Sequence, residues 1–219
     1  MKQFVVIGLG TFGFNVAVAL AKQGREVLAI DMDKEIVEDV KDLVTDAVVA
    51  DVTDRETLAE LVGGDFDTAI LGLGEHSMEA TVLAIVHLKD LGLKTIIVKA
   101  INELRAKVYS SVGATEIIYP EKESAYRLAR KLTVPSLIDE IPLAPEYSIV
   151  ELATPNAFSG NTLRKLRLRE KYGVTVIAIK DVLKDSMVLL PEPDQVIGVD
   201  TVLIVIGRHT DIDKLKSFE

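Results

Sequence analysis

Short apolar runs alternate with amphipathic stretches through the first half of the chain. Most of the runs are continuously apolar, which is typical of strands covered on both faces of a sheet. The runs are Phe4–Ile7, Val27–Ile30, Ala47–Ala50, Ala69–Leu71, Ile96–Val98 and Ile117–Tyr119. The stretches between them predict helices at Thr11–Gln23, Lys34–Lys41, Arg55–Val62, Met78–Leu91 and Glu103–Val112. This regular alternation predicts an α/β fold with a Rossmann-like, doubly wound parallel sheet.

The pattern changes after Tyr119. Glu121–Lys131 has helical spacing, and Pro135 stands at the position that favours the start of a second short helix, Pro135–Glu140. We therefore expect a helical crossover between two domains. Its apolar residues are the expected contact between subunits, and these are Leu132, Val134, Leu137, Ile138 and Ile141. The expected divisions are 1–134 for the nucleotide-binding domain, 135–145 for the crossover helix or linker, and 146–219 for a second domain.

The last third of the chain predicts a small α+β domain. Its expected strands are Tyr147–Ala153, Val174–Ile179, Met187–Leu190 and Thr201–Ile206. One helix is expected over Thr162–Tyr172, and a short helix over Asp211–Phe218 closes the chain.

Composition narrows the classes of function. The 219 residues include no cysteine, so neither a disulfide nor a thiolate metal site is possible. The formal net charge of −9 argues against nucleic-acid binding, which needs a basic surface. No run approaches the ~20 apolar residues of a membrane span, and the start of the chain lacks the pattern of a signal peptide. We expect a cytoplasmic protein.

A glycine-rich loop, Gly8-Leu9-Gly10-Thr11-Phe12-Gly13, follows the first predicted strand and opens the first helix. In this pattern the first glycine permits a tight turn, the second lets a pyrophosphate approach the backbone, and the third lets helix and strand pack closely. The N-terminus of the helix offers N–H donors to phosphate. The position of the loop between strand and helix predicts a nucleotide site.

The ends of the next strands supply further candidates. Asp31, followed by Met32, ends the second strand, where a carboxylate binds ribose hydroxyls and disfavours NADP. Asp31 could instead cap the next helix. Asp51 and Val52 follow the third strand, beside the expected adenine, although Asp51 could equally cap the helix that begins at Arg55. Small residues after the fourth strand leave room for a ligand, and these are Gly72, Leu73 and Gly74.

The chain resembles the TrkA/KtrA family of potassium uptake regulators, which contain RCK domains. Several short segments in the same order and spacing carry this resemblance, and they extend over nearly the whole chain. They are Val6–Gly10, Leu28–Asp31, Ile97–Ala100, Tyr119–Lys122, Tyr147–Leu152, Arg169–Gly173 and Val202–Gly207.

The resemblance implies a regulatory subunit, not an enzyme, that binds adenine nucleotide and gates a membrane potassium channel or transporter similar to TrkH or KtrB. Such proteins form a homo-oligomer, a dimer-based ring that is typically an octamer, at the inner face of the membrane. Lys99 is implied at the nucleotide site, and Glu121 is implied as a ligand of Mg²⁺ or Ca²⁺ near the phosphates. Relatives that respond to ATP often have Arg where this chain has Thr11, which leaves ATP, ADP and NAD(H) all open as ligands.

A basic cluster lies on the predicted helix Thr162–Tyr172, and its members are Arg164, Lys165, Arg167, Arg169 and Lys171. It can be a solvated helix face, with cations favoured near the helix C-terminus. It can also be an anion site, because similar proteins bind cyclic di-AMP near the position of Arg169. The alternative function for the whole chain is a small NAD-dependent oxidoreductase, but we find no nucleophile–base pair and no residue suited to hydride transfer.

Overall fold

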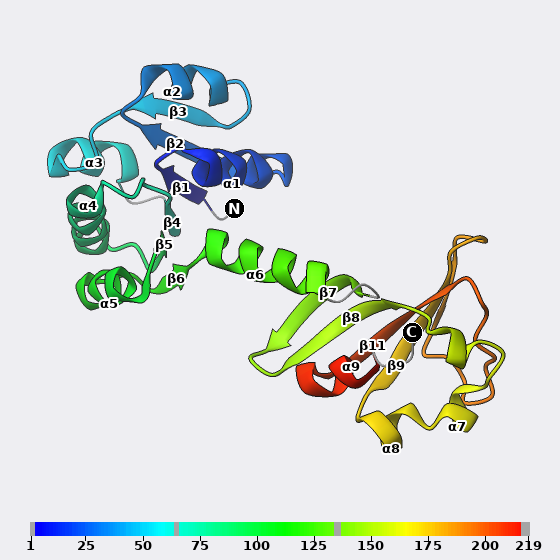
Figure 1. Cartoon of the computed structure of the whole chain (residues 1–219). Helices are drawn as coiled ribbons and strands as arrows, with labels where there is room; N and C mark the ends of the chain where they lie inside the picture. The colour runs from blue at the N-terminus through cyan, green and yellow to red at the C-terminus, as the bar shows by residue number, and fades with distance from the viewer. Residues whose placement is uncertain (1–2, 64–65, 134–136, 216–219) are drawn as a thin grey trace. The chain divides into compact units, whose positions relative to one another are not determined.

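The computed structural model describes residues 3–63, 66–133 and 137–215 (Figure 1). The chain divides into two compact units, Met1–Glu123 and Ser124–Glu219, each with its own sheet and its own apolar core. Within the described residues, none of the helices has the length and hydropathy needed to cross a bilayer.

A parallel sheet forms the first unit. Its strands are β1 (Gln3–Ile7), β2 (Glu26–Asp31), β3 (Asp46–Val49), β4 (Thr68–Leu71), β5 (Thr95–Lys99) and β6 (Glu116–Ile118). They lie in the order β3-β2-β1-β4-β5-β6, and each neighbouring pair is parallel. The direction of winding reverses between β1 and β4, so the predicted doubly wound sheet is confirmed. Ligands of such sheets bind at this reversal, outside the carboxyl ends of the strands.

Helices cover both faces of this sheet. They are α1 (Thr11–Lys22), α2 (Lys34–Val40), α3 (Arg55–Val62), α4 (Met78–Asp90) and α5 (Glu103–Val112), close to the predicted bounds. Successive residues of β1 point to opposite faces. Val5 and Ile7 pack in a core that includes residues of α3, α4 and α5. Val6 packs in a second core with residues of α1 and α2. Burial on both sides explains why the strands read as continuous apolar runs.

The second unit is an antiparallel sheet with helices on its core side. Helix α6 (Pro120–Thr133) begins in the first unit and leads into it (Figure 1). The strands are β7 (Leu137–Ala144), β8 (Tyr147–Ala153), β9 (Thr175–Asp181), β10 (Ser186–Leu189) and β11 (Thr201–Arg208), in the order β10-β9-β11-β8-β7. The helical segments are η1 (Asn156–Phe158), α7 (Leu163–Leu166), α8 (Leu168–Tyr172) and α9 (His209–Leu215).

The expected crossover helix at Pro135–Glu140 is wrong. Residues 137–144 form β7, which pairs antiparallel with β8 from Leu137 opposite Leu152 to Ala144 opposite Tyr147. Pro135 itself lies outside the described residues. β7 is the last strand of the sheet, and an edge strand tolerates a residue without an N–H group, such as Pro142. Pro142 therefore belongs to the hairpin of β7 and β8.

The single helix expected over Thr162–Tyr172 is also wrong. Arg167 adopts the left-handed conformation, with φ 50° and ψ 43°, and divides the segment into α7 and α8. Thr162 caps α7 by accepting a hydrogen bond from the Lys165 amide at 3.2 Å. Leu168, the first residue after the break, is buried in the core of the second unit. The break therefore allows an exposed basic segment to place one leucine in the core.

Apolar side chains remain exposed on α6 and β7. Leu132 is 74% exposed and Ile141 is 58% exposed, and Ile138 is exposed as well. These residues belong to the contact expected between subunits. Val134, another member of that set, lies outside the described residues, as does the end of the closing helix expected to reach Phe218.

Candidate functional site

A cavity of about 350 Å³ lies at the carboxyl ends of the parallel strands. Its wall comes from the ends of β1 to β5 and from the start of α4, so it extends across the reversal of the sheet. Of the residues predicted from the sequence, the following line it: Gly8, Gly10, Asp31, Met32, Asp51, Val52, Gly72, Leu73, Gly74 and Lys99. The fold therefore brings candidates from five strand ends into one cavity.

Two glycines of the loop are required by the packing of the protein itself. Gly8 has φ +84°, and a Cβ there would lie 2.7 Å from the Leu73 amide nitrogen. A Cβ on Gly13 would lie 1.9 Å from the Gly8 carbonyl oxygen. Both distances are shorter than a van der Waals contact allows, so these positions have the turn and packing roles expected of them.

Gly10 is different, because among the described residues, apart from Gly10 and its two neighbours in the chain, no atom lies within 4 Å of the position of its missing Cβ. Its φ of −58° is open to any residue. The fold therefore does not require a glycine at this position. Gly10 faces the cavity at the N-terminus of α1, where the lack of a side chain leaves the helix amides open to a ligand.

The starts of α1 and α4 both border the cavity without a side-chain cap. Neither Gly10 before α1 nor Ser77 before α4 provides a cap hydrogen bond. By contrast, Asp33 caps α2 and Asp54 caps α3 by accepting a backbone N–H. Two uncapped helix ends leave backbone donors available to an anionic group.

Asp31 is held by the backbone around it. Its Oδ2 accepts the Leu9 amide at 2.5 Å, and its Oδ1 accepts the Asp33 amide at 2.9 Å. Asp31 is not the cap of α2, because the N-cap residue of that helix is Asp33. Asp31 instead joins the end of β2 to the glycine loop, and its carboxylate also lines the cavity.

Asp51 and Val52 occupy the end of β3. Asp51 Oδ1 accepts the Thr53 amide at 2.9 Å and the Thr53 hydroxyl at 2.7 Å. The cap of α3 is Asp54, so the helix-cap alternative for Asp51 is wrong. Val52 is buried in the core and forms an apolar part of the cavity wall.

Lys99 and Glu121 form an ion pair beside the cavity. Lys99 Nζ lies 3.1 Å from Glu121 Oε1, and the two side chains are 13% and 65% exposed. Partial burial acts to raise the pKa of the Glu121 carboxyl, but its own backbone amide and the Lys99 ammonium outweigh burial and hold this pKa below its usual value. Lys99 lines the cavity, so Glu121 is connected to the cavity through it.

Glu121 is a single carboxylate. Among the residues that the structure describes, no group of three or more His, Asp or Glu side chains is arranged to hold a metal ion. An ionised and exposed carboxylate fits a divalent cation that takes its other oxygen ligands from phosphate.

The remaining predicted residues of the loop do not line the cavity. Leu9 is buried in the core that includes α1, and Phe12 packs against the same core. Thr11 is exposed at the start of α1. The structure adds Ser77 and Ala80, which the sequence analysis missed because the segment between β4 and α4 carries no recognisable motif. The Arg105 guanidinium of α5 donates a hydrogen bond to the Glu75 carbonyl and holds this segment.

A second cavity, of about 380 Å³, lies in the second unit beside α7 and α8. Three arginines line it, over an apolar wall that includes Leu163 and Val174. Arg164 forms a two-pronged pair with Asp194 at 2.8 and 3.0 Å, and Arg167 pairs with Glu170. The third is Arg169, which is exposed. Part of the basic cluster therefore borders a cavity.

Comparison with known proteins decides the family. A model described as the TrkA-N domain matches residues 4–120, and one described as the TrkA-C domain matches residues 147–218. The chain belongs to the TrkA/KtrA family. One TrkA/KtrA relative is Ktr system potassium uptake protein C of Bacillus subtilis (strain 168), 38% identical over 98% of this chain and 96% of its own length. Another is Ktr system potassium uptake protein A of Vibrio alginolyticus, 33% identical over 99% of this chain and 97% of its own.

Solved structures agree with this TrkA/KtrA assignment in fold. The RCK domain of GsuK covers 99% of this chain with a TM-score of 0.64 and 15% identity. The GsuK channel covers 99% with a TM-score of 0.66 and 15% identity. This chain spans 47% and 39% of those two chains. The likeness confirms the expected RCK-type fold.

The glycine loop allows a test that separates ligand binding from folding. Gly10→Ala should weaken adenine nucleotide by roughly tenfold or more, because a methyl group enters the space beside the helix amides. It should cost less than about 1 kcal/mol of stability, the usual difference between Gly and Ala before a helix. Gly13→Ala should destabilise the unit by about 2 kcal/mol or more, because its Cβ meets the Gly8 carbonyl. Calorimetry and urea unfolding measure the two effects, and nucleotide affinity unchanged in Gly10→Ala would remove this loop from the site.

Proposed function

We propose that this chain is the regulatory subunit of a potassium uptake system, and that adenine nucleotide bound in the cavity of the first unit controls a membrane channel or transporter. One observation carries the proposal: the cavity extends across the reversal of the sheet and is bordered by an unobstructed glycine, two uncapped helix ends and Asp31. The potassium uptake system is inferred from the relatives that match over nearly their full length, because these are named Ktr system potassium uptake proteins.

Each part of a nucleotide has a counterpart in the cavity. Asp31 can accept hydrogen bonds from ribose hydroxyls and would repel a 2′-phosphate, so NADP is disfavoured. The uncapped helices suit a phosphate or pyrophosphate, and Lys99 adds a positive charge. Val52 offers an apolar surface to the adenine, and Asp51 can accept from its amine. ATP, ADP and NAD(H) share these groups, and all three remain candidates.

The alternative of an NAD-dependent oxidoreductase is not favoured. Among the described residues that line the cavity, none is a tyrosine, cysteine or histidine. Lys99, a possible proton donor, is paired with Glu121. The relatives that match over their full length carry the names of potassium uptake proteins. Under this proposal the protein acts by binding a ligand, and it does so in the cytoplasm at the inner face of the membrane.

Glu121 should couple nucleotide binding to a divalent cation. A carboxylate near phosphates is unfavourable unless a cation lies between them. Mg²⁺ or Ca²⁺ should therefore raise the affinity of the wild type for ADP or ATP, and Glu121→Gln should abolish most of that increase. Because the pKa of Glu121 is lowered, its carboxylate stays ionised as the pH falls toward 5, and the metal effect should persist there.

Calorimetry with ATP, ADP and NADH, each with and without the metal, measures this coupling. Glu123→Gln is the matched control, because Glu123 is a second acid in the first turn of α6. If Glu121 only favours the start of the helix, its variant should lose a few tenths of a kcal/mol of stability and keep the full metal effect. If none of the three nucleotides binds the wild type, the nucleotide proposal itself is wrong.

Regulation of a membrane partner requires subunits that move against each other, so we propose a homo-oligomer, with a dimer-based ring of eight as its finer form. The exposed apolar residues of α6 and β7 are the proposed contact. Leu132→Glu should reduce the mass measured by light scattering at micromolar concentration. Leu183→Glu, at an equally exposed leucine between β9 and β10, should not. A wild-type monomer, or equal dissociation of both variants, would contradict this assembly.

The second cavity is the proposed site of a second anionic ligand, for which the family resemblance suggests cyclic di-AMP. Its arginines suit phosphate, and its apolar wall suits a base. Arg169→Ala should weaken cyclic di-AMP by roughly tenfold, which corresponds to one charge-assisted hydrogen bond. Lys165→Ala changes the charge equally but lies outside the lining of the cavity, so it should bind normally. Equal loss in both variants would indicate attraction by general charge instead of a site.

A further inference from the structure

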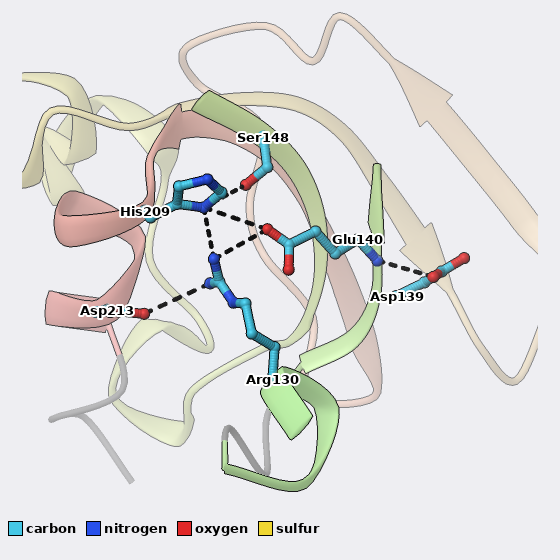
Figure 2. A network of polar contacts seen from close by, with 6 residues as sticks. All are labelled: Arg130, Asp139, Glu140, Ser148, His209 and Asp213. Carbon is cyan, nitrogen blue, oxygen red and sulfur yellow. Dashed lines mark hydrogen bonds and ion pairs between the residues drawn. The ribbon is translucent and has the colours of Figure 1, made fainter. Parts of the chain in front are cut away.

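A network of polar side chains joins α6, β7, β8 and α9 within the second unit (Figure 2). Arg130 comes from α6, Glu140 from β7, Ser148 from β8, and His209 and Asp213 from α9. These residues belong to neither cavity, and the proposed function does not use them.

The network is largely closed to solvent. The Glu140 side chain is 7% exposed, Arg130 is 12% exposed and His209 is 22% exposed. Arg130 Nη1 lies 3.1 Å from Glu140 Oε1 and 2.5 Å from His209 Nδ1. The same Nδ1 lies 3.3 Å from Glu140 Oε1 and 3.3 Å from Ser148 Oγ. A single nitrogen of His209 therefore faces a cation, a carboxylate and a hydroxyl.

The contact with Arg130 favours one protonation state of His209. The guanidinium of Arg130 is always charged and can only donate. The short contact with Arg130 therefore requires a lone pair on His209 Nδ1. The imidazole is then neutral, and Nε2 carries its proton. A proton on Nδ1 would place two N–H donors, from His209 and Arg130, against each other. Such a proton could instead be donated to Glu140 or Ser148.

We propose that His209 is a proton-operated switch on the position of Arg130. With His209 neutral, Nδ1 accepts from Arg130 and holds the C-terminal half of α6 against the start of α9. With His209 protonated, Nδ1–H donates to Glu140 and Arg130 leaves the imidazole. Histidine is the side chain suited to this change, because it ordinarily titrates between pH 5 and 8.

The charged groups around His209 allow both arrangements. Asp213 Oδ1 lies 3.6 Å from Arg130 Nη2, so the displaced guanidinium has a second carboxylate beside it. Arg208, which precedes the histidine, donates to the Tyr147 hydroxyl at 2.8 Å. Asp211 pairs with Lys214 at 2.6 Å. With His209 protonated, its charge and that of Arg130 are balanced by Glu140 and Asp213.

The chain has only three histidines, which makes the neutral state directly measurable. The ¹⁵N shifts of the imidazole nitrogens distinguish the two neutral tautomers and the charged form. At pH 7.5 the wild type should show His209 with an unprotonated Nδ1 and a protonated Nε2. His76→Gln and His87→Gln assign the signals of the other two histidines. A proton on Nδ1 of His209 at this pH would overturn the proposal.

Hydrogen exchange tests whether Arg130 leaves His209 when the histidine is protonated. Between pH 7.5 and 5.5, after correction for the intrinsic effect of pH, amides 128–132 of α6 and 211–215 of α9 should exchange roughly tenfold faster, as expected for the loss of one charge-assisted hydrogen bond. His209→Gln keeps an uncharged acceptor for Arg130 and should abolish the change, while His76→Gln and His87→Gln should retain it. A pH effect that persists in His209→Gln, or no effect in the wild type, would overturn the switch. The tautomer measurement uses the wild type, so it stands even if His209→Gln does not fold.

Discussion

The close approach of the backbone at the glycine loop is the constraint on which the first unit depends. A Cβ at Gly13 would overlap the Gly8 carbonyl, and a Cβ at Gly72 would lie 3.0 Å from the same oxygen. The start of α1, the end of β1 and the end of β4 therefore meet at one oxygen atom. This meeting places the uncapped end of α1 beside the reversal of the sheet, where the cavity lies. The packing of three backbone segments thus determines where an anionic ligand can be held.

The parallel sheet could be predicted from sequence because burial on both faces produces unbroken apolar runs. The second unit was harder to predict for physical reasons. β7 contains proline and acidic residues and is a strand because it pairs with β8 in a hairpin, an interaction that the local propensity of β7 does not report. The break at Arg167 has no signal in the sequence, since arginine seldom adopts the left-handed conformation and the leucine that follows it is buried through tertiary packing.

The candidate site was predictable where chemistry follows a motif. The glycine loop and Asp31 stand at the ends of strands that could be located, and both line the cavity. Ser77 could not be found, because its segment is placed by α5 through Arg105. Lys99 and Glu121 pair because β5 and β6 are neighbours in the sheet. Lys99 ends β5, and Glu121 lies just after β6. The network around His209 was absent from the sequence analysis, because its members are distant along the chain and share no spacing.

The passage from one compact unit to the other falls between Glu123 and Ser124, inside α6. Domains are usually joined by an irregular segment, which proteases cleave because it fits their extended binding clefts. Residues 121–129 are exposed, yet their backbone is helical, and a protease can cut it only after the helix unwinds locally. The rate of limited proteolysis in this segment therefore reports the melting of one helix and not the looseness of a linker.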